Sequence, residues 1–177
     1  MTRSAERTSI TRVHRDDGVT LALPSQVPLR RLPHDLAHFV VEQALGLTSG
    51  FWGAVAGGAI FGGTEVFPRR RTSRVEERSR HVMKRLGPRI TEAESLVGTV
   101  VKIYERRLDR DWAAARRLFA GMWRPARPSR ALPDQAEVRR VCEALAEAEE
   151  RWLALAIGEC VTLRWPRQRA GAMMRSL

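Results

Sequence analysis

Hydrophobic positions alternate with polar ones near the start of the chain and recur every three or four residues through most of the rest. Val19, Leu21 and Leu23 alternate behind the turn sequence Asp16-Asp17-Gly18. Such alternation buries one face of a strand, and Asp-Gly is typical of a tight hairpin turn because glycine tolerates positive φ. Residues 10–23 are therefore expected to form an antiparallel β-hairpin.

Helical spacing governs the segments that follow. Pro33 fits the first position of a helix that runs to about Leu45, because proline lacks the N–H that a first-turn residue leaves unbonded. Further apolar repeats of three and four residues predict helices at about 75–86, 91–108, 112–122 and 134–152. Gly87-Pro88 is expected to separate the first two of these helices, and Thr91 with Glu94 to form a capping box at the start of the second.

A final alternating segment, Glu159–Trp165, predicts a strand that adds to the hairpin. The expected fold class is α+β: mostly helical, with four or five helices and a small antiparallel sheet from the N-terminal hairpin and the C-terminal strand. A length of 177 residues suits one domain. We place that domain at residues 10–165, between a disordered N-terminus at 1–9 and a frayed C-terminal tail at 166–177.

Residues 43–64 carry no charge and include seven glycines. This length just reaches the roughly 20 residues that a membrane-spanning helix needs. However, Thr48-Ser49-Gly50 predicts a break, and the remaining run from Phe51 to Phe61 is too short to span. We therefore expect a buried helix or loop and no membrane span. An alternative is that the segment packs against a partner, for example in a homo-oligomer.

The positive charge is concentrated in the middle of the chain. Residues 69–130 hold 18 basic and 7 acidic residues, and this excess of 11 equals the net charge of the whole protein. Such a region attracts phosphate backbones or acidic proteins. The candidate anion-binding residues open this region: Arg69, Arg70, Arg71, Arg74 and Arg78. The favoured interpretation is a binding protein whose Arg-rich helical surface contacts an acidic protein or nucleic acid. An ordinary solvated helix surface is the alternative.

The densest candidate chemistry lies at the start of the first helix. His34 and His38 are four residues apart, so a helix places both imidazoles on one face, where they can bind one metal ion. Asp35 follows the first histidine and is a candidate catalytic acid or base. Zinc needs a third ligand, and Glu42 is poorly placed because it lies about 12 Å along the axis from His34. Acidic residues from later elements are candidates instead: Glu65, Glu76 and Glu77.

Two enzyme families share parts of this pattern. His34-Asp35-x-x-His38 resembles the HExxH motif of metalloproteases, with the shorter Asp in place of Glu. His34-Asp35 also resembles the adjacent pair of HD-domain phosphohydrolases. That family needs an upstream histidine and a downstream aspartate as well, and this chain offers His14 and either Asp109 or Asp111. Both resemblances imply a metal-dependent hydrolase that uses zinc or another divalent metal.

A longer segment, Leu32–Gly63, resembles bacterial proteins that share an LPHDLxHFVVE-type sequence followed by a Gly-rich apolar stretch. This resemblance implies a bacterial origin and a shared fold, and it assigns no role to any residue. A purely structural interpretation of the cluster is also open. Asp35 then favours the helix dipole, His34 bonds to the entering loop, and Glu42 pairs with an arginine.

The remaining features favour an ordinary intracellular protein. Cys142 and Cys160 lack metal-ligand spacing and suit reduced thiols, and the charged N-terminus has no signal-peptide pattern. We therefore expect a cytoplasmic protein. Trp123, beside Arg124, is a candidate for stacking on a base or a partner. Binding is favoured over catalysis, and the hydrolase is the alternative.

Overall fold

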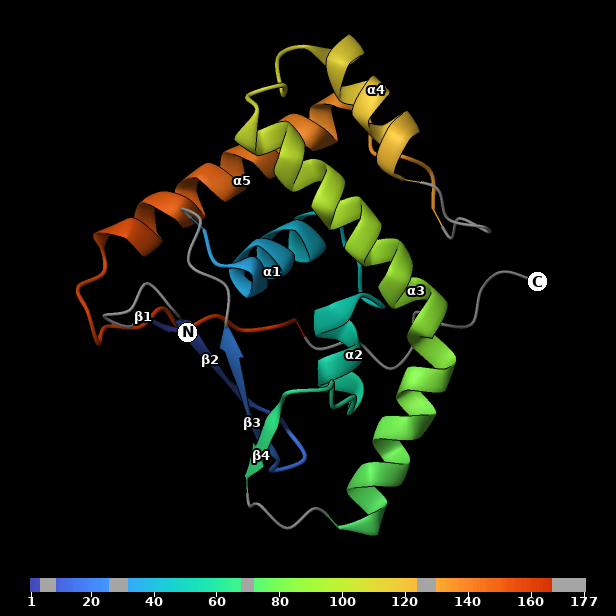
Figure 1. Ribbon diagram of the computed structural model, residues 1–177, viewed down its shortest axis with the longest axis vertical. Coiled ribbons are helices and arrows are strands. Elements are labelled where there is room, and N and C mark those ends of the chain that lie inside the picture. The colour runs from blue at the N-terminus through green and yellow to red at the C-terminus, as the bar shows by residue number, and fades with distance from the viewer. Residues whose placement is uncertain (4–8, 26–31, 68–71, 124–129, 167–177) are drawn as a thin grey trace.

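The computed structural model describes residues 1–3, 9–25, 32–67, 72–123 and 130–166 (Figure 1). These ranges contain five helices and one four-stranded antiparallel sheet, so the expected α+β, mostly helical class is confirmed. The strands are β1 (Thr2–Arg3), β2 (Ser9–His14), β3 (Thr20–Ser25) and β4 (Glu65–Phe67). The helices are α1 (His34–Ala44), α2 (Phe51–Gly57), α3 (Ser73–Glu105), α4 (Trp112–Met122) and α5 (Gln135–Ala154).

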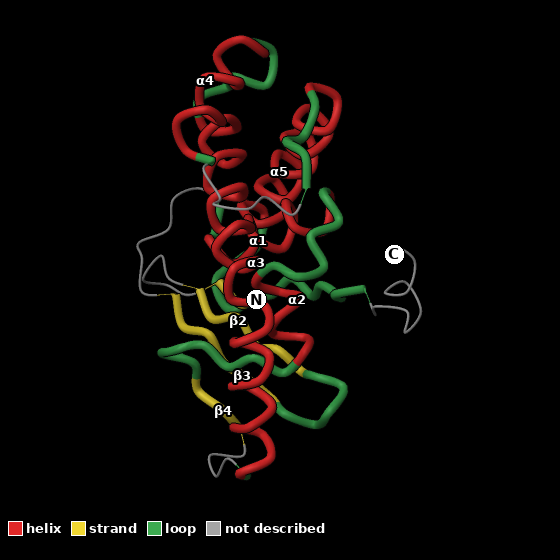
Figure 2. The backbone as a smooth tube through the Cα atoms, turned by 90° about the vertical axis from the view of Figure 1, so that its right-hand side faces the viewer, coloured by secondary structure: helices red, strands yellow, loops and turns green. Residues whose placement is uncertain are grey.

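The helices α1, α4 and α5 gather at one end of the molecule and the strands at the other, while α3 runs along both (Figure 2). Of the hydrophobic clusters that hold this arrangement together, two include residues of α1. The larger joins the four long helices through residues such as Val41, Val100 and Leu145. The second joins the sheet to α1 and α2, where Leu21 and Trp52 are buried. Helix α1 contributes to both clusters and therefore lies at the centre of the fold.

The sheet is built on the predicted hairpin. Strands β2 and β3 pair in antiparallel register with Val13 opposite Leu21, and Gly18 in the turn has a φ of 79°. Strand β4 pairs with the other edge of β3, which places Val66 opposite Leu21. The short β1 pairs with β2, so Thr2–Arg3 belongs to the sheet and not to a disordered N-terminus.

The expected C-terminal strand is much shorter than predicted. Of Glu159–Trp165, Cys160 alone forms a bridge, opposite Thr2. Backbone hydrogen bonds of 3.0 Å from Arg3 to the Glu159 carbonyl and from Val161 to the Met1 carbonyl flank that bridge. The segment beyond it finds no strand partner among the described residues, because β1 itself is two residues long. Residues 4–8 and 167–177, expected to be disordered or frayed, lie outside the described ranges.

Helix α3 is one continuous helix where the sequence predicted two, and this is the largest difference between prediction and structure. It continues from Ser73 to Glu105 with Pro88 inside it, so Gly87-Pro88 does not end a helix. The proline removes one backbone hydrogen bond, a cost of about 3 kcal/mol or more. Burial of α3 side chains on both sides of Pro88 offsets that cost: Val82, Ile90, Ala93 and Leu96. Thr91 donates its hydroxyl to the Gly87 carbonyl at 3.2 Å instead of capping a helix, which frees Glu94 for another contact.

The helix starts predicted for α4 and α5 are confirmed. Asp111 caps α4 by accepting from the Ala114 amide, and Asp134 forms a capping box with Glu137 at the start of α5. The uncharged segment folds into α2 and its flanking loops, with Trp52, Ala54 and Val55 buried. Within the described ranges, no helix has both the length and the apolar character to cross a membrane.

Candidate metal centre

His34 and His38 lie one turn apart on the same face of α1, with ring centroids 4.5 Å apart. The two rings differ in environment. The His34 side chain is 69% exposed, whereas that of His38 is 3% exposed. Helix α1 therefore presents one exposed and one buried imidazole on the same face.

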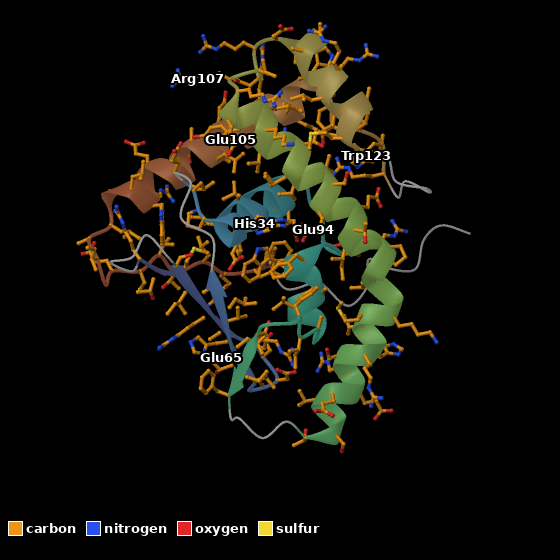
Figure 3. The ribbon with its side chains drawn as sticks, viewed as in Figure 1. His34, Glu65, Glu94, Glu105, Arg107 and Trp123 are labelled. Atoms are coloured by element: carbon orange, nitrogen blue, oxygen red, sulfur yellow. The ribbon has the colours of Figure 1, made fainter. Side chains whose placement is uncertain are left out.

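Glu94 of α3 completes the cluster, as Figure 3 shows for the labelled His34 and Glu94. Its Oε2 atom lies 3.2 Å from Nε2 of His38. One potential ligand atom from each of His34, His38 and Glu94 lies within 4.8 Å of the others. Tetrahedral zinc with ligands at 2.0–2.2 Å places them about 3.3 Å apart. The exposed side chains of His34 and Glu94 can close the remaining gap by small rotations.

The structure does not place any of the three expected acidic residues in this cluster. Glu65 is exposed on β4, at the sheet end of the molecule (Figure 3). Glu76 and Glu77 lie near the start of α3, and Glu77 is about 25 Å along the helix from Glu94. Glu94 was missed because the predicted break at Pro88 assigned it to a cap. Continuing the helical repeat of Val82, Ile90 and Ala93 would have placed it beside the buried face of one long helix.

Glu42 lies on the other side of His38 and is fully buried. Nδ1 of His38 donates to its Oε1 atom at 3.0 Å. The backbone amides of Phe51 and Trp52 donate to the two carboxylate oxygens at 3.0 Å each. Glu42 therefore belongs to the cluster through His38 and α2, and not through the arginine pair that the structural interpretation expected.

Charge pairing sets the protonation of His38. Burial by itself lowers the pKa of this imidazole, but the hydrogen bonds to Glu42 and Glu94 outweigh burial and raise the pKa to about 9. The hydrogen bond from His38 in turn lowers the pKa of Glu94. At neutral pH, His38 is thus an imidazolium between two carboxylates. A metal ion at Nε2 must displace a proton.

Asp35, the candidate catalytic residue, is tied to the sheet. Its Oδ2 atom accepts from the Thr11 hydroxyl at 2.9 Å, and its Oδ1 atom lies 3.8 Å from Nδ1 of His34. Its backbone carbonyl also accepts from the Trp52 indole at 3.1 Å. The hydrogen bonds of Asp35 therefore join α1 to β2 and α2, and its catalytic role stays a prediction.

Of the residues that an HD-type site would need, His14 and Asp111 lie elsewhere, and Asp109 lines the groove beside the cluster without belonging to it. Nδ1 of His14 on β2 is 3.2 Å from the Thr20 hydroxyl, and Asp111 caps α4. Neither belongs to the cluster that holds His34 and His38. The arrangement thus departs from that family at its upstream histidine.

A groove of about 1340 Å³ opens beside the cluster, between α1, α3 and α5. Small and apolar side chains line part of it, namely Ala37, Val97, Gly98, Val101 and Ala146. Charged residues of both signs line the rest: Lys102, Glu105, Arg107, Asp109, Arg110, Glu143 and Glu149. From Glu94 to Glu105 the groove follows α3 for about 16 Å. A ligand in this groove can therefore contact both the histidine cluster and a charged, partly apolar channel.

Cys142 also lines this groove. Its burial, aided by Asp109 and Glu143, raises the pKa of the thiol to about 12. A thiol that stays protonated is a poor nucleophile and a poor metal ligand. The chemistry of the groove therefore depends on its histidines and carboxylates.

The Arg-rich region does not form one patch. Its exposed members on the N-terminal half of α3 are Arg74, Arg78, Arg80, Lys84, Arg85 and Arg89. Others, such as Arg107, lie just beyond the opposite end of the same helix, whose 33 residues span about 50 Å (Figure 3). Arg78 holds the Gly57 carbonyl at 2.9 Å and approaches Asp17, so it links α3 to α2 and the hairpin turn. Arg69, Arg70 and Arg71 lie outside the described residues.

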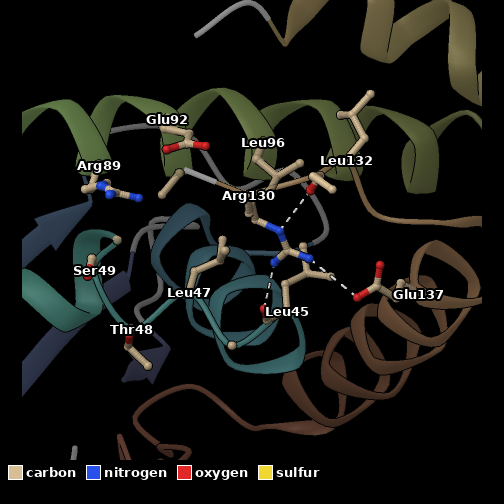
Figure 4. Close-up of a pocket in the computed structure, with 14 residues that line it drawn as sticks. Leu45, Leu47, Thr48, Ser49, Arg89, Glu92, Leu96, Arg130, Leu132 and Glu137 are labelled. Atoms are coloured by element: carbon tan, nitrogen blue, oxygen red, sulfur yellow. Dashed lines mark hydrogen bonds and ion pairs between the residues drawn. The ribbon is translucent and has the colours of Figure 1, made fainter. Parts of the chain in front are cut away.

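A second pocket, of about 540 Å³, lies where α1 and α3 meet the loop before α2 (Figure 4). Arg130 donates to the Leu45 carbonyl at 2.7 Å and to the Ala131 carbonyl at 3.2 Å, and it lies 3.4 Å from Glu137. These contacts commit its guanidinium to joining α1 with α5. Arg130 therefore has a structural role in this pocket.

Comparison of the chain with protein-family models, with curated proteins and with solved structures finds no match.

Proposed function

We propose that this protein binds a divalent transition-metal ion, with zinc as the best fit, through His34, His38 and Glu94. The observation that supports this proposal is the convergence of three ligand atoms from α1 and α3 within 4.8 Å. Two imidazoles and one carboxylate are a ligand set that zinc favours. The buried His38 supplies a fixed ligand, and the two exposed side chains can adjust around the ion.

The proposed activity is metal-dependent hydrolysis in the adjoining groove. Three protein ligands leave a fourth zinc position for water, and zinc lowers the pKa of a bound water to about 7. His34, His38 and Glu94 all line the groove, so a substrate there would meet that position. Asp35 lies beside His34, with its Oδ1 atom 3.8 Å from Nδ1 of the imidazole, while the Thr11 hydroxyl donates to its other oxygen.

Metal titration tests the binding proposal. We expect the full-length protein to bind one Zn²⁺ or Co²⁺ per chain, measured by competition with a chromophoric chelator and by the visible Co²⁺ spectrum. His34→Ala and Glu94→Gln should each weaken binding by about 10-fold or more because each removes a ligand. Glu77→Gln, an exposed change on the same helix, is the matched control. No binding at micromolar metal, or equal binding by all four proteins, would reject the proposal.

Hydrolysis is tested separately with zinc-loaded and chelator-treated protein. Phosphate esters and peptides are the two substrate classes that the sequence resemblances suggest. We expect turnover that needs zinc and is lost in His34→Ala. Equal rates in the loaded and stripped protein would remove the hydrolase and leave metal binding alone.

Binding of an acidic partner or nucleic acid through the Arg-rich surface is the second candidate. It is favoured by the six exposed basic residues on the first half of α3, against the two acidic residues Glu76 and Glu77. We expect binding of DNA or RNA that weakens steeply as salt rises. Replacing Arg80, Lys84 and Arg85 together by Glu should abolish it, while Arg116→Glu with Arg117→Glu on α4 serves as the control. Unchanged nucleic-acid mobility at low salt would exclude nucleic acid as the partner.

A further inference from the structure

Glu42 is a fully buried carboxylate whose oxygens are held by hydrogen bonds from neighbouring elements. A buried carboxylate is unfavourable unless hydrogen bonds replace its lost hydration. Glu42 receives three, from His38 Nδ1 and from the backbone amides of Phe51 and Trp52, each at 3.0 Å. Its two oxygens are thus occupied by fixed donors on two different helices.

Helix α2 fixes the carboxylate from one side. The helix begins after Gly50, which offers no side-chain cap, so Glu42 of α1 accepts from its first two amides. A Cβ atom on Gly50 would lie 2.6 Å from Oε2 of Glu42 and 2.7 Å from its Cδ. The carboxylate therefore rests directly against the Gly50 backbone, and no larger residue fits there without displacing it.

His38 must adapt to this fixed acceptor. The amides of Phe51 and Trp52 donate to both oxygens of Glu42, so this side chain acts as an acceptor and the imidazole has to keep its hydrogen on Nδ1. The lone pair of the neutral ring then lies on Nε2, the atom 3.2 Å from Glu94. The Phe51 ring packs edge-on against His38, with centroids 5.9 Å apart, and limits rotation of the imidazole.

We propose that Glu42 is the positioning residue of the metal site, an inference that rests on the metal binding proposed above. Glu42 holds Nδ1–H of His38 and thereby directs Nε2 toward His34, Glu94 and the ion. It does not bind the ion itself, because its oxygens lie on the Nδ1 side of the ring. Partners of this kind fix the tautomer of a ligating histidine and raise its basicity. Glu42 also caps α2, so the Gly-rich segment becomes part of the support of the metal centre.

Two variants test this role. Glu42→Gln leaves all three first-sphere ligands in place, but its amide can no longer accept from all three donors. Gly50→Ala keeps the carboxylate and displaces it. Both should weaken Co²⁺ and Zn²⁺ binding by about 10- to 100-fold while one ion per chain still binds. Gln43→Ala, an exposed change on α1, should bind like wild type. Binding at wild-type affinity by a folded Glu42→Gln or Gly50→Ala protein would overturn the proposal.

A measurement on the unaltered protein covers the case in which these variants fail to fold. Nitrogen-15 NMR of the zinc-loaded wild-type chain reports which ring nitrogen of His38 carries hydrogen. We expect hydrogen on Nδ1 and zinc on Nε2, and the reverse assignment would overturn the role of Glu42. Absence of any zinc binding by wild type would instead reject the metal site, so the two failures are distinguishable.

Discussion

The two halves of α3 differ in where their charged side chains lie: mostly in solvent in the first half, and against a buried histidine in the second. Around residues 74–89, Arg78 bonds to α2, while the five other exposed basic side chains extend into solvent, where salt and water screen them and where each ion pair contributes little. In the second half of α3, Glu94 contacts the imidazolium of His38, which is almost fully buried and is bonded on its other side to Glu42. Interactions between a few charges removed from water are directional and strong, whereas interactions between many charges in water are neither. Net charge alone is therefore a poor guide to where chemistry can occur in this protein.

Among the variants that test this difference between buried and exposed charge, His38→Ala should have the largest effect. It leaves Glu42 buried without one of its donors and Glu94 without its partner, so we expect a loss of about 3 kcal/mol in the free energy of unfolding. Metal binding should disappear as well. Urea unfolding monitored by circular dichroism measures the stability. The matched control is His34→Ala, an exposed site expected to change stability by less than about 0.5 kcal/mol. Equal losses for both variants would contradict the distinction between buried and exposed charge.

The dependence of stability on pH sharpens the same contrast. The folded pKa of His38 is about 9, above its ordinary value of 6.5, so its stabilising contribution is complete below pH 6.5 and is lost as pH rises through 9. The pKa of Glu94 is lowered from 4.5, so its contribution is present above pH 4.5 and is lost as pH falls through the lowered folded value. We therefore expect the pair to stabilise most between about pH 4.5 and 6.5, measured by urea unfolding across pH. A metal-free protein whose stability does not decrease between pH 6.5 and 9 would disagree, and His38→Ala should lack that decrease.

Pro88 separates the two halves of α3 and provides the next test. Pro88→Ala restores a backbone donor at an exposed helical position, and we expect the free energy of unfolding to rise by roughly 1–3 kcal/mol. Metal affinity should stay within about twofold of wild type. Thermal unfolding and metal titration of the same sample give both values. A loss of stability would show that the proline conformation is itself required at this position.

The smallest effect is expected on the basic half. Arg80→Ala or Arg85→Ala should change the free energy of unfolding by less than about 0.5 kcal/mol. Arg78→Ala should cost more, about 1 kcal/mol, because it removes the hydrogen bond to the Gly57 carbonyl. Urea unfolding of the three variants in parallel checks the order. A large loss at Arg80 would indicate that this half of α3 is held by its charges after all.

The predicted helix break at Pro88 and the failure to predict Glu94 as a member of the cluster have the same origin. Local rules treat Gly87-Pro88 as a break, and a break makes Thr91 and Glu94 a plausible cap. Packing of α3 against α1, α2, α4 and α5 outweighs the local cost, and the uninterrupted helix then directs Glu94 toward His38. The third member of the cluster could not be predicted while the helix that carries it was divided in two.

The sequence alone determined what depends on neighbours a few residues apart. The Asp-Gly hairpin, the starts of α4 and α5, and the shared face of His34 and His38 all follow from spacings of two to four residues. The tertiary structure alone decided which distant residues meet. Glu94 lies 56 positions after His38, the two amides that hold Glu42 belong to another helix, and the clustered arginines spread along a helix of 33 residues. Contacts of this kind depend on how helices pack, and packing is set by the whole buried surface and not by any local pattern.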